Sequence, residues 1–285
     1  MGSIDHDKLF ETMACEIYHH LRESEEDMTR RMRAVVIDWL VEVSEYYRLV
    51  PETLYLTINY IDRYLSCTPI DPRRLQLLGV TCMMIASKYE EIRAPKVDDF
   101  CYITDNTYSH DEVLQMESSV LDFLKFEMTA PTARCFLRLF LVPNAQMDIY
   151  NMGIRPMQLL YLASYISDLS LLRYRMLHYA PSLIAASAIF LARFLFMPSR
   201  KPWNLILRNY TPYQPSDLQE CVKALHELVC KCPHFKLQTI REKYSRHSYK
   251  RVAKITCPAS IPLENFKDIT SRRNDRSKKS ATMNK

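Results

Sequence analysis

The fold is decided by Leu77-Leu-Gly-Val-Thr-Cys-Met-Met-Ile-Ala86, a stretch that returns 106 residues later as Leu183-Ile-Ala-Ala-Ser-Ala-Ile-Phe-Leu-Ala192. Both stretches are apolar on every side of a helix, a pattern typical of a helix buried at the centre of a bundle. The amphipathic segments that follow them match as well, four apolar residues against four: Val113, Met116, Val120 and Leu124 against Leu218, Cys221, Leu225 and Val229. One apolar pattern used twice at helical spacing predicts a repeated helical unit.

Composition favours an all-α chain. The 285 residues are 48% hydrophobic, enough for one large domain or two modest ones. Only Gly2, Gly79 and Gly153 are glycines, against about 7% in average usage. Glycine-rich phosphate loops, dinucleotide-binding turns and hairpin-dense β folds all need backbone conformations that glycine supplies. The composition therefore argues against all three.

Periodicity and start signals place the helices. One face of a first helix is marked by five apolar residues: Met32, Val36, Trp39, Val43 and Tyr46. Asp71 followed by Pro72, and the capping boxes at 109–112 and 216–219, mark helix starts. We expect one group of helices at 52–66, 71–91, 95–101 and 109–126. We expect a second group at 132–142, 156–172, 181–197, 203–209 and 217–231, with shorter helices near 237–245 and 249–255.

The two copies differ in their polar residues. Asp62, Lys88 and Glu117 of the first copy align with Ser167, Phe194 and Val222 of the second. A polar group in a helix core costs free energy unless it is paired. The first copy therefore is expected to keep these residues for a purpose that the second copy lacks.

Charge is concentrated at the C-terminal end. The net charge is +5, and residues 272–285 hold six basic residues and one acidic residue. The rest of the chain is therefore neutral in total, which argues against nucleic-acid binding by the folded body. Nine cysteines, an odd number, in a chain without a signal-peptide pattern predict reduced thiols in the cytosol or nucleus.

No membrane or catalytic pattern stands out. Residues 180–197 are apolar but interrupted by Arg193 and bracketed by prolines, so we interpret them as a core helix rather than a span. Glu90 and Glu91 are adjacent, and neighbouring helical residues point in different directions. Cys230, Cys232 and His234 could bind a metal but lack a fourth ligand at useful spacing. We therefore predict no enzyme activity, no metal and no cofactor.

Several motifs, in the same order along the chain, resemble the cyclin box. They are Met32-Arg-Ala-Val-Val-Ile-Asp-Trp-Leu-Val-Glu-Val43, Asn59-Tyr-Ile-Asp-Arg-Tyr-Leu-Ser66, Leu75-Gln-Leu-Leu-Gly79 and Ala86-Ser-Lys-Tyr-Glu-Glu91. Phe100-Cys-Tyr-Ile-Thr-Asp-Asn-Thr-Tyr108 and residues 181–192 are similar to A-type mitotic cyclins, those of plants in particular. The resemblance covers about residues 11–268.

The resemblance implies an all-α fold of two tandem five-helix cyclin boxes, with a short N-terminal helix and a basic C-terminal tail. The implied divisions are an N-terminal helix and linker over residues 1–31 and an N-terminal box over 32–129 that docks kinase and substrate. A C-terminal box, the structural repeat, covers 130–256. A partly disordered basic tail covers 257–285.

The resemblance also implies the activity. Cyclins bind and activate a cyclin-dependent kinase as a heterodimer, here with a role between S phase and G2/M. Five residues match kinase-binding positions: Lys88, Glu117, Tyr89, Glu91 and Leu121. Arg33 and Asp62 would pair inside the first box, with Leu77 as a further structural residue. Without the resemblance, Lys88 would be interpreted as a surface lysine and Glu117 as a solvated helix residue.

A second site is implied, a docking patch for Arg-x-Leu motifs of substrates or inhibitors. Its residues would be Met32, Val35, Val36, Trp39, Glu42, Leu75 and Gln76. The apolar members would form the leucine pocket, Glu42 would receive the arginine and Gln76 would bond to the peptide backbone. Without the resemblance, such a stripe is core. The family commonly has Ile-Leu at positions 35 and 36, so we expect a shallower pocket here.

The two ends of the chain carry further expectations. Residues 15–26 resemble the family's N-terminal helix, but only residues 27–31 separate them from the first box. No Arg-x-x-Leu degradation signal precedes Met32, so we expect no timed degradation through one. The basic run from Arg272 to Lys279 is either a nuclear import signal or a solvated end. We expect the protein in the nucleus, and in the cytoplasm as well.

One alternative comes from another class of protein. Some transcription factors share this fold and bind nucleic acid, but they need a basic body surface. A D-type cyclin is disfavoured because no Leu-x-Cys-x-Glu segment precedes the first box.

Overall fold

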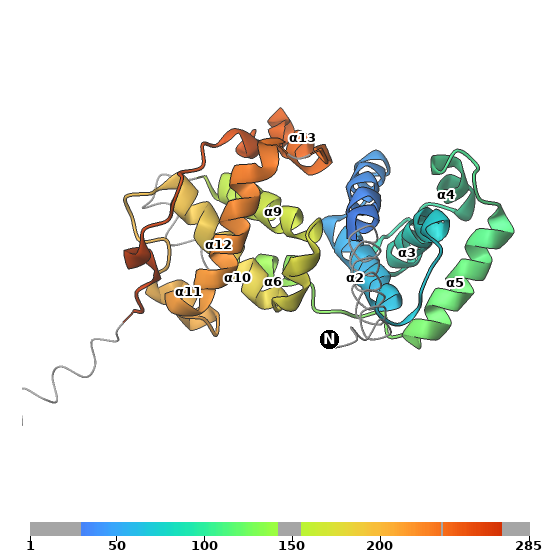
Figure 1. The fold of residues 1–285 in the computed structure, drawn as a ribbon, viewed down its shortest axis with the longest axis horizontal. Coiled ribbons are helices and arrows are strands. Elements are labelled where there is room, and N and C mark those ends of the chain that lie inside the picture. The colour runs from blue at the N-terminus through green and yellow to red at the C-terminus, as the bar shows by residue number, and fades with distance from the viewer. Residues whose placement is uncertain (1–29, 142–154, 235, 270–285) are drawn as a thin grey trace, which may run out of the picture. The chain divides into compact units, whose positions relative to one another are not determined.

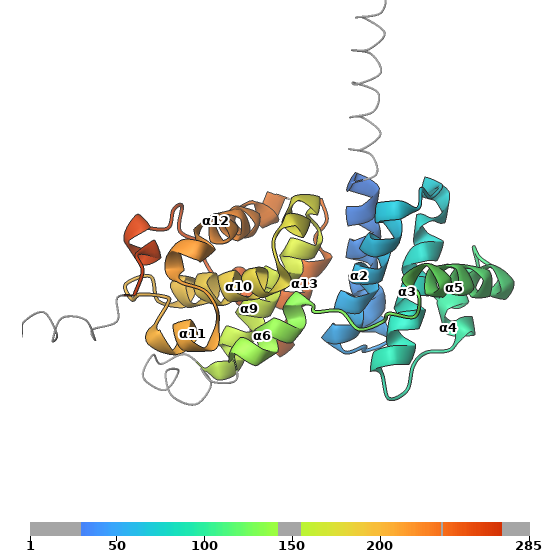
Figure 2. The same cartoon turned by 90° about the horizontal axis from the view of Figure 1, so that it is seen from below.

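A computed structural model of the chain describes residues 30–141, 155–234 and 236–269. These residues are helical and contain no strand, so the all-α prediction is confirmed. They form two compact units (Figures 1 and 2). The first unit ends at Ala130 and also includes Leu171–Arg175, and the second comprises Pro131–Ser170 and the described chain from Met176 on.

The first unit is organised around one buried helix. A helix over residues 30–46 is followed by α2 (Pro51–Cys67), the 3-10 turn η1 (Pro72–Arg74), α3 (Leu75–Glu90), α4 (Val97–Ile103) and α5 (His110–Leu124). In both views α3 lies between α2 and α5 (Figures 1 and 2) and packs against each of them. Every residue from Leu77 to Ser87 is buried, which is what its continuous apolar run predicts.

Glycine lets the first helix approach α3 closely. A Cβ added at Gly79 would lie 3.0 Å from Cγ1 of Val36 and 3.4 Å from Cδ1 of Leu40. The first contact is tighter than ordinary packing, so the missing side chain sets how near the helix over 30–46 lies to the start of α3.

Local signals fix the helix ends of this unit. The Asp71 carboxylate accepts a bond of 2.9 Å from the Arg73 N–H and so caps η1. At the start of α5, Ser109 N–H donates to Glu112 at 2.9 Å and Glu112 N–H donates to the Ser109 hydroxyl at 3.3 Å. This is the predicted capping box, and the bonds from Ser109 lower the pKa of Glu112.

Two predicted boundaries differ from the structure. The short helix α4 begins at Val97 rather than Pro95. The helix α5 ends at Leu124 because Lys125 (φ 51°) and Phe126 (φ 56°) both take left-handed backbone, which no α-helix can continue.

The second unit repeats the arrangement around α10 (Pro181–Phe196). Its other described helices are α6 (Ala133–Leu141), α9 (Pro156–Leu171), α11 (Leu205–Tyr210), α12 (Pro215–Lys231) and α13 (Thr239–Ser245). The helix α10 lies between α6 and α12 and packs on both (Figure 1). Small residues such as Ala185, Ala188 and Ala192 are fully buried in it. No helix of the described chain is long and apolar enough to cross a membrane.

Two predictions for the second unit were wrong. The helix α12 begins earlier than expected, because Pro215 occupies its first turn and Gln214 forms the capping box with Asp217 in place of Ser216 and Gln219. Residues 249–255 form the 3-10 turns η4 (His247–Tyr249) and η5 (Val252–Lys254), since Lys250 and Arg251 take left-handed backbone.

The C-terminal segment is described over residues 257–269, the first part of the tail that is predicted to be partly disordered. Most of these residues are exposed or half-buried, and Phe266 is buried. They include the turn η6 (Leu263–Phe266), in which Phe266 stacks on Phe190 of α10 with ring centroids 5.1 Å apart. Aromatic burial of this size holds the segment in place.

The second copy also keeps buried charge, contrary to the sequence alignment of the two copies. Asp168, one position after the aligned Ser167, is 4% exposed. Its Oδ2 accepts a bond of 2.8 Å from the Tyr244 hydroxyl and lies 3.7 Å from Nζ of Lys243. The contacts of Asp168 with Tyr244 and Lys243 therefore lie within the second unit and join α9 to α13.

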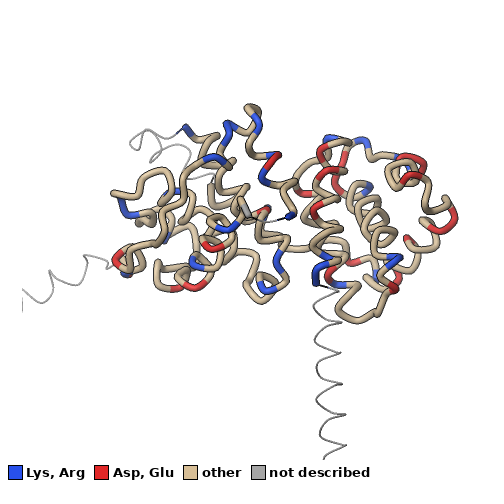
Figure 3. The backbone as a smooth tube through the Cα atoms, turned by 45° about the horizontal axis from the view of Figure 1, so that its top comes forward, with Lys and Arg blue, Asp and Glu red and all other residues tan. Residues whose placement is uncertain are grey.

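The two units differ in charge, although the folded body is neutral in total. Acidic residues outnumber basic ones between residues 30 and 130, whereas basic residues outnumber acidic ones in the described chain from 155 to 269 (Figure 3). The statement that the body is neutral therefore holds for the total and not for each unit.

Candidate partner-binding surface

The end of α3 and the middle of α5 are joined at the surface by an ion pair. Nζ of Lys88 lies 2.7 Å from Oε1 of Glu117. The lysine side chain is 47% exposed and the glutamate side chain 14%. Because an ammonium carries three N–H donors and the bond to Glu117 uses one, Lys88 can also donate to a partner. Glu117 is shielded from water, so it holds the lysine in one orientation.

Two other predicted kinase-binding residues are Tyr89, at the end of α3, and Leu121, on α5. Tyr89 is 50% exposed, and its hydroxyl is 2.8 Å from Oγ1 of Thr129. Leu121 is half-buried on α5, and its carbonyl accepts a bond of 3.1 Å from Phe126 N–H. These residues present apolar surface whose position is fixed by internal hydrogen bonds.

Glu91 has an internal role that the sequence did not indicate. Its Oε1 accepts bonds of 2.7 Å each from the Val50 N–H and the Thr53 hydroxyl. Val50 is the N-cap residue of α2 and has no polar side chain of its own. Glu91 therefore provides, from another part of the chain, the hydrogen-bond acceptor that the N-cap of α2 lacks, and it stabilises that helix.

Two exposed apolar residues were missed. Ile92 directly follows the C-cap of α3 and is fully exposed. Phe126 follows α5 and is 67% exposed, with its side chain presented by the left-handed backbone. Together with Tyr89 they give the first unit three large exposed apolar side chains near the ends of α3 and α5. In the sequence, each of the two missed residues could have been found as a large apolar residue at the end of a predicted helix.

The structural residues lie in one buried arrangement. Nε and Nη2 of Arg33 bond to the two carboxylate oxygens of Asp62 at 2.6 and 2.7 Å. Nη1 of Arg33 donates to the Leu171 carbonyl at 2.9 Å. The arginine side chain is 4% exposed and the aspartate 17%. Leu77 of α3 is fully buried. The bidentate pair fixes the helix over 30–46 on α2.

The docking-patch residues of the first helix lie at the border between its buried face and solvent. Val35 is 54% exposed and Glu42 is exposed, whereas Met32, Val36 and Trp39 are half-buried. The buried residues of this helix are Arg33, Ile37, Asp38, Leu40, Val41, Val43 and Ser44. The predicted apolar stripe is therefore divided: Val43 belongs to the core, whereas Met32, Val36 and Trp39 are half-buried.

The start of α3 borders this patch through the close contact between Gly79 and Val36. Gln76 is half-buried, one turn before Gly79, and Leu75 is 4% exposed. Leu75 thus belongs to the core, and Gly79 is a residue of the patch that the sequence analysis did not single out. Residues 15–26 and the basic run from Arg272 lie outside the described residues.

Comparisons with known proteins identify both units. The model of the cyclin N-terminal domain matches residues 7–129, and the model of the cyclin C-terminal domain matches residues 131–258. Cyclin-A1-3 of Oryza sativa subsp. japonica is 57% identical over 92% of this chain and 56% of its own length. Cyclin-A1-1 of Arabidopsis thaliana is 55% identical over 91% of this chain and 58% of its length.

Cyclin-A1-4 of Oryza sativa subsp. japonica is 54% identical and is covered over 78% of its length. The chain thus spans little more than half the length of the first relatives it matches. A viral cyclin from herpesvirus saimiri has a similar fold, with a TM-score of 0.60, 21% identity and coverage of 70% of this chain and 84% of the viral one. The resemblance drawn from the sequence motifs is confirmed.

Removing either member of the Arg33–Asp62 pair leaves a buried charge without its partner. We predict that Arg33→Ala and Asp62→Ala each lower the free energy of unfolding of the first unit by about 3–5 kcal/mol. The double variant should cost less than the sum of the two. Urea unfolding followed by Trp39 fluorescence in a Trp203→Phe background reports the first unit. Additive losses would contradict a coupled pair.

Proposed function

The chain belongs to the cyclin family, and on that premise we propose that it binds a cyclin-dependent kinase and activates it during the cell cycle. Cyclins are regulatory subunits and not enzymes. The relatives reported above are A-type cyclins of plants, and we propose that the kinase acts between S phase and G2/M.

The observation that carries the proposal is the Lys88–Glu117 pair. An exposed ammonium held by a shielded carboxylate at 2.7 Å is a fixed donor for the carbonyl groups of a partner's backbone. Exposed apolar side chains at Tyr89, Ile92 and Phe126 accompany it in the first unit. Interfaces of this kind combine a few anchored polar contacts with apolar area.

Activation needs no chemistry from the cyclin itself. A protein kinase is active when its strand lysine pairs with a glutamate of its C-helix. A rigid module that binds the kinase only with this helix turned inward shifts the population toward the active state. Converting a mostly inactive kinase into a mostly active one requires about 5 kcal/mol of differential binding. The helix α3, buried from Leu77 to Ser87, supplies a rigid base for such a surface.

The patch on the first helix supports recruitment of Arg-x-Leu substrates or inhibitors. Val35, Val36 and Trp39 offer apolar surface, and the exposed Glu42 lies on the same helix to receive an arginine. Gln76 at the start of α3 supplies an amide for the peptide backbone. A peptide motif bound here would be held close to the kinase and so be phosphorylated preferentially.

Two further points concern charge. The surplus of basic residues in the second unit favours nucleic-acid binding as the second candidate function, and strong loss of DNA affinity with added salt would be its signature.

We also propose that the basic run from Arg272 to Lys279 directs nuclear import, with part of the protein in the cytoplasm. Deleting the run should reduce nuclear accumulation, and unchanged accumulation would reject the signal.

We predict that replacing Lys88 and Glu117 together by alanine nearly abolishes kinase activation at the cyclin concentration that is half-maximal for the unchanged protein, while the fold remains. Each interface anchor contributes about 2 kcal/mol or more, so half-maximal activation should require at least about 30 times more cyclin. The measurement is the phosphorylation rate as a function of cyclin concentration, with thermal melting as the test of folding.

The matched control replaces Lys223 and Glu220, an exposed pair 3.4 Å apart in the second unit. This double variant should activate the kinase normally. An unchanged activation curve for a well-folded Lys88→Ala, Glu117→Ala variant would refute the assignment of the site.

We predict that Trp39→Ala lowers kcat/KM for Arg-x-Leu substrates by about tenfold, because an aromatic anchor of the pocket is lost. Peptides that lack the motif should be phosphorylated as before. Tyr46→Ala, an exposed aromatic residue at the end of the same helix, is the control and should change neither rate. Equal losses on both kinds of peptide would mean that Trp39 acts in the core.

A further inference from the structure

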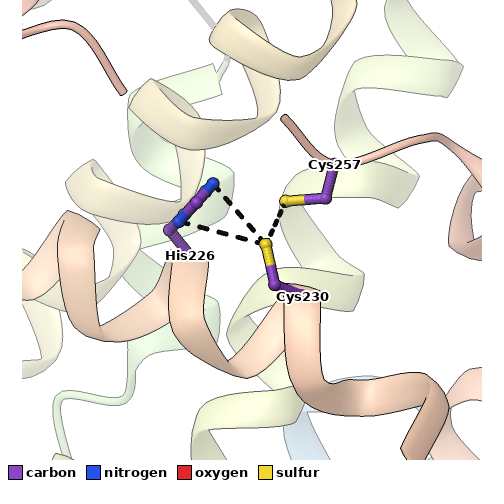
Figure 4. A group of neighbouring side chains, drawn as sticks. All are labelled: His226, Cys230 and Cys257. Atoms are coloured by element: carbon purple, nitrogen blue, oxygen red, sulfur yellow. Dashed lines mark hydrogen bonds between the residues drawn. The ribbon is translucent and has the colours of Figure 1, made fainter. Parts of the chain in front are cut away.

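A histidine and two cysteines meet on the second unit, where no role has been assigned. His226 and Cys230 are four residues apart on α12 and therefore lie on the same face of that helix. Cys257 comes from the segment that follows η5 and lies over the same face (Figure 4). One ligand atom from each residue falls within 4.8 Å of the other two. Figure 4 shows both sulfur atoms pointing toward the space beside the imidazole ring.

The distances approach those of a soft-metal site. The Cys230 and Cys257 sulfurs are 2.8 Å apart, and Cys230 Sγ lies 3.6 and 4.0 Å from Nε2 and Nδ1 of His226. Ligands of a tetrahedral zinc ion with bonds of about 2.0–2.3 Å stand roughly 3.5–3.8 Å apart. A small separation of the two sulfurs would admit an ion. Since Cys230 and Cys257 are only half-buried, an ion can reach them from solvent.

The histidine already has the supporting hydrogen bond of a metal ligand. Its Nε2 lies 2.8 Å from the Pro258 carbonyl oxygen, and because a carbonyl can only accept, Nε2 carries the hydrogen. In the neutral ring Nδ1 is then the nitrogen without a hydrogen, 4.0 Å from Cys230 Sγ, and a rotation of the ring would turn its lone pair toward the thiols. Metal-binding histidines usually donate their second N–H to a carbonyl or carboxylate in this way. The supporting hydrogen bond of such a site is therefore present.

The chemistry of the three side chains suits a soft divalent cation. A bound cation ionises coordinating thiols outright. Two sulfurs and one imidazole nitrogen are the ligand set preferred by Zn²⁺ among the common divalent ions.

We propose that His226, Cys230 and Cys257 bind one zinc ion through Nδ1 and the two thiolates, with water as the fourth ligand. Binding releases the two thiol protons to solvent. The ion would tie the C-terminal segment to α12, closing a loop of 27 residues between Cys230 and Cys257. Its role is structural, because it holds in place the chain that leads to the Phe266–Phe190 contact. Sequence spacing pointed to Cys232 and His234 as companions of Cys230, whereas the fold supplies His226 and Cys257.

The test is a titration of the full-length, reduced, metal-free protein with Co²⁺, followed by displacement with Zn²⁺. We expect one tightly bound cobalt per chain, with thiolate charge-transfer absorption and the visible bands of tetrahedral coordination. Zinc should replace it and raise the melting temperature of the second unit. Cys257→Ser should abolish the thiolate-rich spectrum, and His226→Gln should weaken binding at least about tenfold.

Two controls keep the outcome decisive. Glutamine can still donate to the Pro258 carbonyl, so His226→Gln should melt like the unchanged protein without metal. Cys135→Ser removes an exposed thiol of the same unit outside the cluster and should leave the spectrum intact. Binding that is absent, or equal in all variants, would overturn the proposal. So would a Cys230–Cys257 disulfide, detected by mass spectrometry, in protein that binds no metal when reduced.

Discussion

The bidentate pair between Arg33 and Asp62 is the interaction on which the first unit depends. The guanidinium is almost removed from water and donates three internal hydrogen bonds, two to Asp62 and one to the Leu171 carbonyl. A buried charge that loses its partner is strongly destabilising, so the pair holds the helix over 30–46 in its position on α2. That position brings Val36 against Gly79 and leaves Val35 and Glu42 in solvent. The proposed docking patch is therefore a consequence of the pair.

The two units show how one helical scaffold serves two purposes. In the first, the central helix α3 ends in the exposed Lys88, which Glu117 orients. In the second, the aligned position on α10 is Phe194, which is 2% exposed. Charge in the second unit is used internally, where Asp168 meets Lys243 and Tyr244. The proposed partner-binding surface therefore lies on the first unit, while the second unit uses its buried charges for its own packing.

Sequence periodicity predicted the helices because apolar spacing and capping residues are local properties. Ser109 and Glu112 are an example, since both members of that box lie within one turn. Long-range pairings could not be predicted in this way. Glu91 accepts the hydrogen bond of the Val50 N–H at the start of α2, although the two residues are 41 positions apart. Cys257 lies beside His226, although the helix α13 separates them in the sequence. The resemblance to cyclins supplied Arg33 and Asp62 as partners, whereas the exposed Ile92 and Phe126 emerged only from the backbone at the helix ends.

Amide hydrogen exchange of the chain, with and without a cyclin-dependent kinase, tests the central claim most directly, because it locates the surface that a partner covers. The account predicts slower exchange in the first unit, at the end of α3 around Lys88 and Ile92 and along α5 near Glu117. Exchange around His226 in the second unit should stay the same. No change with any such kinase, or slower exchange confined to the second unit, would contradict the account.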